Sequence, residues 1–155
     1  MTFFPEEIFE VHVSVNDRQR SKEFYQRVLN FELAADIDRR DITFLWMGPR
    51  GSRMIGLWGP SCPNPPISRG IAHFAMRLLP EEFLDAPRKL KLLDVTPLDF
   101  DGKPTDEPVV LTWMPALSIY FKDPDGNSLE FISMLEDKPK PDLGVVKYSE
   151  WIRRR

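Results

Sequence analysis

Glu130 is a carboxylate inside a predicted apolar strand, just after a tight turn. The turn, Asp123-Pro124-Asp125-Gly126, has Asp at its first position, Pro at its second and Gly at its fourth. The flanking runs Ile119–Phe121 and Leu129–Ile132 are rich in aromatic and β-branched residues, so the segment predicts a β-hairpin. A carboxylate among such neighbours costs on the order of several kcal/mol unless it is paired or binds a metal. The simpler alternative is an edge-strand Glu that faces solvent.

The chain has two histidines, His12 and His73, and both occupy mid-strand positions among apolar residues. His12 shares one face of the strand Ile8–Val15 with Glu10, and His73 has the equivalent place on the strand Gly70–Leu78. A single mid-strand His is more often a hydrogen-bonded core residue than a ligand. Two imidazoles and a carboxylate from a third strand, however, can form a facial triad for a divalent metal with positions open for water or substrate.

The first of these strands opens a strand–helix–strand–strand–strand pattern. The strand Ile8–Val15 is followed by a helix from Asp17 or Arg18 to Leu29, with Asp17 as a plausible N-cap. Asn30 then stands at C′, where a left-handed conformation is usual. Three strands are predicted next, at Leu33–Ile37, Ile42–Met47 and Arg53–Trp58.

The proline-rich segment Ser61–Ser68 has linker composition, and after it the pattern restarts. The strand Gly70–Leu78 precedes a helix that Pro80 opens and that Pro87 breaks or kinks. Three more strands are predicted near Val95–Phe100, Ala116–Phe121 and Leu129–Met134. One such unit cannot bury both faces of its sheet, so two should pack or pair. The prediction is an α+β fold of paired βαβββ modules, with the modules at about 8–60 and 70–134 and a tail at 135–155, all within one domain over 1–155.

Composition excludes several functional classes. With 155 residues, 42% hydrophobic and 29% charged, the chain is long enough to bury a sizeable core and is typical of a globular domain. Its formal net charge of −3 argues against nucleic-acid or anionic-membrane partners. Its single cysteine, Cys62, excludes an intrachain disulfide, and we expect no signal peptide and no membrane span. We therefore expect a cytoplasmic protein.

Three segments resemble the vicinal oxygen chelate superfamily, which includes glyoxalase I, fosfomycin-resistance thiol transferases, extradiol dioxygenases and bleomycin-binding proteins. They are Val15–Tyr25, the strand that starts His73-Phe-Ala-Met, and Asp123-Pro-Asp-Gly-Asn-Ser-Leu-Glu130. The resemblance covers about residues 8–134 and implies a curled mixed sheet that forms a half-barrel with flanking helices. It also implies a homodimer, because half-barrels of this superfamily often close across subunits.

The resemblance also implies a set of metal ligands. His73 stands at the second His ligand of the superfamily and Glu130 at its last carboxylate. The first-strand His of the superfamily aligns without a gap on Glu10, and His12 lies one strand dyad further along, about 6.6–6.8 Å away. Either Glu10 supplies an oxygen ligand, or a bulge brings His12 into the site, or no metal binds; we favour His12. The strand Arg53–Trp58 carries no acid, unlike four-ligand glyoxalases.

The pocket around this site is expected to be apolar and aromatic, and its candidate lining residues are Ser14, Trp46, Trp58, Arg77 and Trp113. Each Trp is about equally well explained as plain core, and Arg77 is better explained as a solvated strand-end residue.

Three functions follow from the resemblance. The first is a metal-dependent lyase, isomerase or thiol transferase that chelates adjacent oxygens of a small organic substrate with Mn²⁺, Ni²⁺, Zn²⁺ or Fe²⁺, with Glu130 or Glu10 also able to act as a catalytic base. The second is a metal-free protein of the bleomycin-resistance type that sequesters a small molecule. The third is an extradiol-type dioxygenase that uses Fe²⁺, although relatives of that kind usually carry two more modules.

Overall fold

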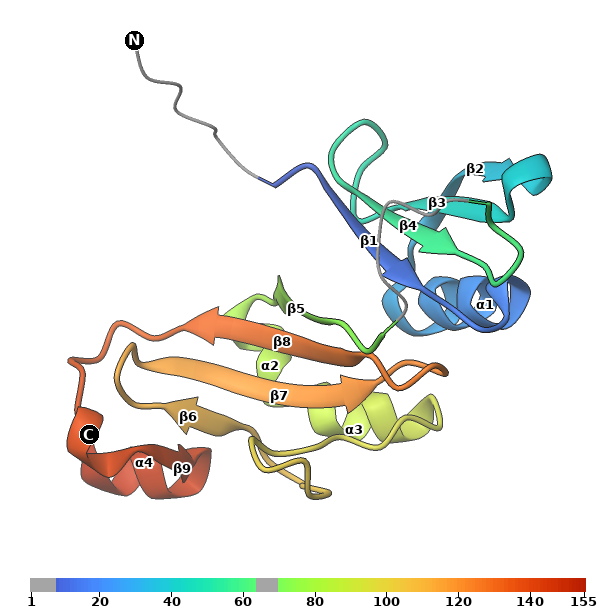
Figure 1. Ribbon diagram of the computed structural model, residues 1–155. Helices are drawn as coiled ribbons and strands as arrows, with labels where there is room; N and C mark the ends of the chain where they lie inside the picture. Colours follow the sequence, from blue (N-terminus) through green and yellow to red (C-terminus); the bar gives the residue numbers. More distant parts are fainter. Residues whose placement is uncertain (1–7, 64–69) are drawn as a thin grey trace, which may run out of the picture. The chain divides into compact units, whose positions relative to one another are not determined.

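The computed structural model describes residues 8–63 and 70–155, which fall into two compact units with one sheet each (Figure 1). The first unit lies within residues 1–72 and also includes the turn 123–126, and the second comprises 73–122 and 127–155. Both sheets are mixed and both carry helices, which confirms the predicted α+β fold class. Within the described residues, no helix combines the length and apolar character needed to cross a membrane.

The sheet of the first unit has the strand order β1-β4-β3-β2. Strand β1 is parallel to β4, and the pairs β4–β3 and β3–β2 are antiparallel. The elements are β1 (Glu10–Ser14), α1 (Arg18–Leu29), β2 (Glu32–Ile37), the short 3₁₀ helix η1 (Asp38–Arg40), β3 (Ile42–Trp46) and β4 (Met54–Trp58). These match the five elements predicted for the first module to within two residues at each end.

Helix α1 begins and ends as its sequence predicts. The Asp17 side chain accepts a hydrogen bond from the backbone N–H of Arg20 at 2.9 Å, and Asn30 has a left-handed φ of 54°. The buried residues of the helix include Phe24 and Tyr25, which face the sheet.

The acids of the Asp-Pro-Asp-Gly turn bind α1 and the residue that leads into it. Asp125 accepts hydrogen bonds from the backbone N–H of Asn16 at 2.8 Å and the hydroxyl of Ser21 at 2.7 Å. The buried hydroxyl of Tyr25 donates to Asp123 at 3.0 Å, and burial, with the nearby Asp123 charge, raises the pKa of Tyr25. These two carboxylates of the motif therefore have a structural role in the first unit.

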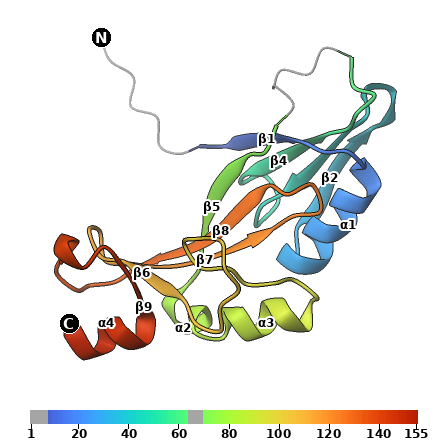
Figure 2. The same cartoon turned by 60° about the horizontal axis from the view of Figure 1, so that its bottom comes forward.

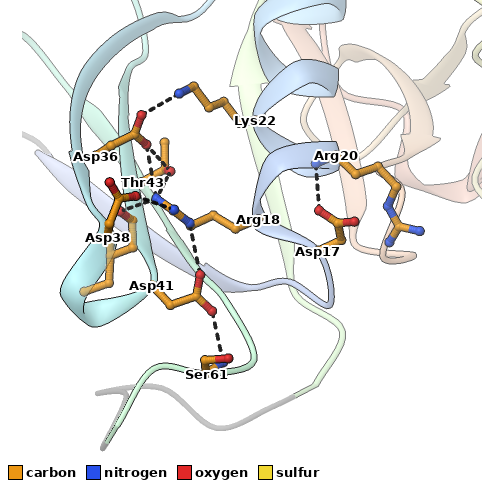
Figure 3. Close-up of polar contacts among 10 residues, drawn as sticks. Asp17, Arg18, Arg20, Lys22, Asp36, Asp38, Asp41, Thr43 and Ser61 are labelled. Carbon is orange, nitrogen blue, oxygen red and sulfur yellow. Dashed lines mark hydrogen bonds and ion pairs between the residues drawn. The ribbon is translucent and has the colours of Figure 1, made fainter.

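Arg18 joins α1 to the β2–β3 connection (Figure 3). Its guanidinium lies 2.6 Å from Asp38, 3.0 Å from Asp41 and 3.3 Å from Asp36. Asp36 also pairs with Lys22 at 2.5 Å. Burial raises the pKa of Asp36, but the hydrogen bonds it accepts and the two nearby cations outweigh burial and hold it below its ordinary value.

The sheet of the second unit has the order β5-β8-β7-β6-β9, with β5 and β8 parallel and the other pairs antiparallel. Its strands are β5 (His73–Arg77), β6 (Val109–Leu111), β7 (Ala116–Lys122), β8 (Ser128–Met134) and β9 (Val145–Lys147). Its helices are α2 (Pro80–Phe83), α3 (Ala86–Leu92), the 3₁₀ helix η2 (Pro141–Leu143) and α4 (Tyr148–Arg154). Helices α2, α3 and α4 lie on one side of the sheet (Figure 2), where Phe83, Ala86 and Trp151 pack with Val110, Leu117 and Ile119.

Two predictions for the second module need correction. The prediction of a strand near Val95–Phe100 was wrong. Leu98 forms only isolated bridges, and the strand that pairs with β7 on this side of the sheet is β6. Pro97 has no N–H to donate, and Asp99 accepts from two backbone N–H groups, which favours a turn. The predicted helix divides into α2 and α3, and Pro87 stands in the first turn of α3.

Two further predictions concern the linker and the tail. Most of the linker predicted at Ser61–Ser68 lies outside the described residues. The tail adds β9 to the second sheet, and α4 buries Trp151 completely. That both modules form one domain over residues 1–155 stays a prediction.

Candidate metal and ligand site

The second unit brings His73 and Glu130 together. Strands β5 and β8 are parallel with Ala75 opposite Glu130, so His73 is the diagonal neighbour of the acid on the same face. Its Nε2 lies 3.3 Å from Oε2 of Glu130. Glu130 is buried, whereas about half of the His73 side chain is exposed. A buried acid therefore meets an accessible imidazole.

Ser118 fixes the other oxygen of this carboxylate. Its buried hydroxyl donates to Oε1 of Glu130 at 2.6 Å, which leaves Oε2 directed at His73. Tyr120 lies opposite Glu130 on β7, and its ring centroid is 6.2 Å from that of His73. Burial and the adjacent Glu130 carboxylate raise the pKa of Tyr120, so its phenol stays protonated at neutral pH.

The hydrogen bond on the far side of His73 sets its tautomer. Nδ1 lies 3.1 Å from the backbone carbonyl oxygen of Ser128, and a carbonyl can only accept, so Nδ1 carries a proton. In a neutral ring Nε2 is then bare and faces the carboxylate Oε2 of Glu130. Two acceptors at 3.3 Å are satisfied either by a second proton on His73 or by a cation between them. An imidazole whose distal N–H donates to a carbonyl is the arrangement that metal-binding histidines adopt.

The first unit brings Glu10 and His12 together on β1. The two side chains share a face, and Nε2 of His12 lies 3.3 Å from Oε1 of Glu10. The indole N–H of Trp58 donates to Nδ1 of His12 at 2.5 Å. Both ring nitrogens of His12 are thus engaged by neighbours within this unit.

The strand opposite His12 leaves space for its ring. Gly56 pairs with His12 across β1 and β4, and a Cβ at this position would lie 2.6 Å from Nδ1 of His12. Phe44 flanks the ring in an edge-on arrangement at 6.0 Å. Strand β4 carries no acid, as noted from the sequence, and at the position opposite His12 it carries a glycine beneath the imidazole.

The predicted pocket residues fall in different environments. In the first unit Trp58 is 6% exposed, and Trp46 and Ser14 are half-buried on the face that carries His12. In the second unit Arg77 is exposed on the His73 face, and Trp113 is 46% exposed. Trp113 contacts Phe100, which in turn contacts Tyr120.

Sequence reasoning missed Ser118, Tyr120 and Phe100. Ser118 and Tyr120 could have been found from the hairpin register. That register places Tyr120 opposite Glu130, and Ser118 stands two residues before Tyr120 on the same face of β7. Phe100 lies at the end of the segment predicted as a strand. No sequence pattern there indicates that its ring contacts Tyr120.

The donor set of the second unit fits two ligands of a divalent metal, a bare imidazole nitrogen and a carboxylate oxygen. Across the described ranges 8–63 and 70–155, no three or more His, Cys, Asp or Glu side chains gather to hold a metal ion. His73 and Glu130 belong to the second unit, and Glu10 and His12 to the first. That a group from β1 completes the site with them stays a prediction.

Comparisons with known proteins agree with this architecture. An integron cassette protein, HFX_CASS4, from the mobile metagenome of the Halifax Harbour sewage outfall is 29% identical, with a TM-score of 0.70 over 84% of this chain and 100% of that one. Lactoylglutathione lyase from Agrobacterium tumefaciens is 22% identical, with a TM-score of 0.61 over 83% and 93% of the two chains. The fosfomycin resistance protein FosX from Mesorhizobium loti is 16% identical, with a TM-score of 0.56 over 86% and 96%. The last two show similarity of fold alone.

The family model for the Glyoxalase/Bleomycin resistance protein/Dioxygenase superfamily matches residues 7–131. This range includes β1 to β7 and β8 up to Phe131, and with them all four candidate ligands. The match spans most of the chain, and the protein belongs to this superfamily.

Proposed function

We propose that this protein is a metal-dependent enzyme that acts on a small organic substrate with adjacent oxygens, in a reaction of the lyase, isomerase or thiol-transferase type. His73 and Glu130 are the two ligands we assign to the metal. The observation that carries the proposal is the 3.3 Å approach of Nε2 of His73 to Oε2 of Glu130, with the distal atoms of both groups held by hydrogen bonds. That a neighbour of the same fold is a lactoylglutathione lyase supports the reaction class.

A divalent ion, with Mn²⁺, Ni²⁺, Zn²⁺ and Fe²⁺ as the candidates, would supply Lewis-acid stabilisation of an enolate or alkoxide in the chelated substrate. The residues of the chain provide the rest. Ser118 keeps Oε1 of Glu130 occupied, so that Oε2 alone is available for a ligand or a proton. Glu10, or Glu130 if it leaves the metal, would accept a substrate proton. The exposed rings of Phe100 and Trp113 offer apolar surface for the carbon skeleton of a substrate.

A metal-free binding protein is the second candidate. The observation that favours it is the engagement of both His12 ring nitrogens by Trp58 and Glu10, which leaves this histidine without a free lone pair. In this case His73 carries two protons and forms an ion pair with Glu130.

The metal content of protein purified without chelators separates the two candidates. The enzyme proposal expects the wild type to retain about one ion per chain, or to bind added Zn²⁺ with that stoichiometry, and His73→Ala to lose it. A wild type that neither carries nor binds metal, with a depressed melting temperature for His73→Ala, contradicts the enzyme and supports the binder.

We further propose a cytoplasmic homodimer. The single cysteine, Cys62, is free and buried, which suits a reducing compartment. A molecular mass of 18.1 kDa per chain makes monomer and dimer easy to separate by light scattering.

A further inference from the structure

The hydrogen bond between Trp58 and His12 fixes the proton on the imidazole of His12. An indole N–H can only donate, so Nδ1 of His12, at 2.5 Å, must accept. A neutral imidazole whose Nδ1 is bare carries its proton on Nε2. This nitrogen lies 3.3 Å from Oε1 of Glu10.

This tautomer leaves His12 without a lone pair for a metal. One lone pair receives the indole N–H, and the other nitrogen carries the proton and lies 3.3 Å from a carboxylate oxygen of Glu10. Binding a metal through Nε2 would move the proton to Nδ1 and set an N–H against the N–H of Trp58. His12 therefore does not fit the ligand role for which its position on β1 made it a candidate.

Packing holds the ring in this orientation. The backbone of Gly56 lies beneath it with no room for a Cβ, the edge of Phe44 flanks it, and the indole of Trp58 lies 5.5 Å away between ring centroids. The guanidinium carbon of Arg40 lies over the ring of Trp58, 5.4 Å from its centroid. The side chain of His12 is only 24% exposed, compared with 51% for His73.

We propose that His12 is a positioning residue that orients the carboxylate of Glu10, and that Trp58 locks it in the Nε2–H tautomer. Glu10 is then the chemically active group of β1, available as an oxygen ligand or as a base. The tautomer and the positioning stand on the geometry of the first unit alone. The use of Glu10 in a reaction rests on the proposed function.

Nitrogen-15 NMR of the imidazole rings tests this assignment, and the chain is favourable because it has only two histidines. At neutral pH, without metal, we expect His12 to show a bare Nδ1 and a protonated Nε2. On addition of Zn²⁺, His12 should keep its Nε2 proton, while Nε2 of His73 shifts to a metal-bound position. A protonated Nδ1 in His12, or loss of its Nε2 proton on Zn²⁺ addition, would overturn the proposal.

The same spectra keep the two proposals apart. If neither ring responds to Zn²⁺ while His12 shows the expected tautomer, the metal-dependent function fails and the positioning role survives. Trp58→Phe removes the indole donor, so the Nδ1 resonance of His12 should move toward the value of a ring that exchanges between tautomers. Trp46→Phe, on the same face of the sheet but opposite Met54, should leave that resonance in place. An unchanged Nδ1 resonance in Trp58→Phe counts against the lock.

Discussion

Ser118 donates a hydrogen bond to Oε1 of Glu130 at 2.6 Å, and this single contact decides which oxygen of the carboxylate meets His73. Ser118 and Glu130 are both buried, and they stand on the neighbouring antiparallel strands β7 and β8. A buried carboxylate with one oxygen held by a hydroxyl donor has a fixed direction. That direction is the property a ligand or base requires.

Replacing Ser118 by Ala tests this relationship. The carboxylate loses its donor, so we expect unfolding to become easier by about 1–3 kcal/mol and Zn²⁺ affinity to fall about 10–100-fold. Denaturant titration and Zn²⁺ titration of the same preparations measure both quantities. Ser133→Ala is the matched control, because Ser133 is a buried serine on the opposite face of β8. Equal Zn²⁺ affinities for Ser118→Ala and the wild type would contradict the role given to this hydroxyl.

Replacing His73 by Ala separates an enzyme from a binder. About half of this side chain is exposed, and Phe74 and Met76 on the other face of β5 stay in place, so the stability should change by less than about 0.5 kcal/mol while metal retention is lost. A loss of about 1–3 kcal/mol with no metal in the wild type would instead reveal an ion pair with Glu130. Arg77→Ala, exposed on the same strand, should retain wild-type metal content.

The sequence was sufficient for the pairing of His73 with Glu130, because strand alternation and the hairpin turn fix which face each residue takes. It was insufficient for the choice between Glu10 and His12. That choice depends on which partner meets each nitrogen of the ring, and the partner, Trp58, comes from a strand 46 residues away. The alternation of residues along a strand predicts which face of the sheet a side chain lies on, but not which hydrogen-bond donor it will meet.

The fold shows the same division. The elements of the first module follow local signals, such as the Asp17 cap and the left-handed Asn30. Strand β6 was missed because its three residues are identified by their pairing with β7 and β9 and are too few to show a period. The segment before it looked more like a strand, but Pro97 and the Asp99 turn interrupt it.

Gly56→Ala tests the space beneath His12. A Cβ would lie 2.6 Å from Nδ1 of His12 and 3.1 Å from the ring of Phe44, so the imidazole must shift, and its hydrogen bond with Trp58 is disturbed. We expect the indole N–H resonance of Trp58 to shift and stability to fall by about 1–3 kcal/mol. Gly70→Ala is the control, since nothing lies within 4 Å of a Cβ there. An unshifted indole resonance in Gly56→Ala would show that the ring does not depend on this glycine.

Asp36 should make the first unit sensitive to acid. Its pKa in the folded chain lies below the ordinary value of 3.8, because the bonds from Lys22 and Thr43 and the charge of Arg18 outweigh the effect of burial (Figure 3). A folded-state pKa below that of the unfolded chain means that Asp36 contributes stability above about pH 4 and loses it as the pH falls through the folded value. Asp36→Asn should therefore be less stable than the wild type at pH 7, and the difference should shrink as the pH falls below about 4.

Urea midpoints measured from pH 7 to pH 2 check this prediction. Asp142→Asn, an exposed aspartate of the second unit, should follow the wild-type curve throughout. The ion pairs of Asp36 with Arg18 and Lys22 link helix α1 to β2, so the mutant difference should also decrease in high salt. A stability difference for Asp36→Asn that stays constant from pH 7 to pH 2 would mean that the ionised carboxylate is not what holds this link together.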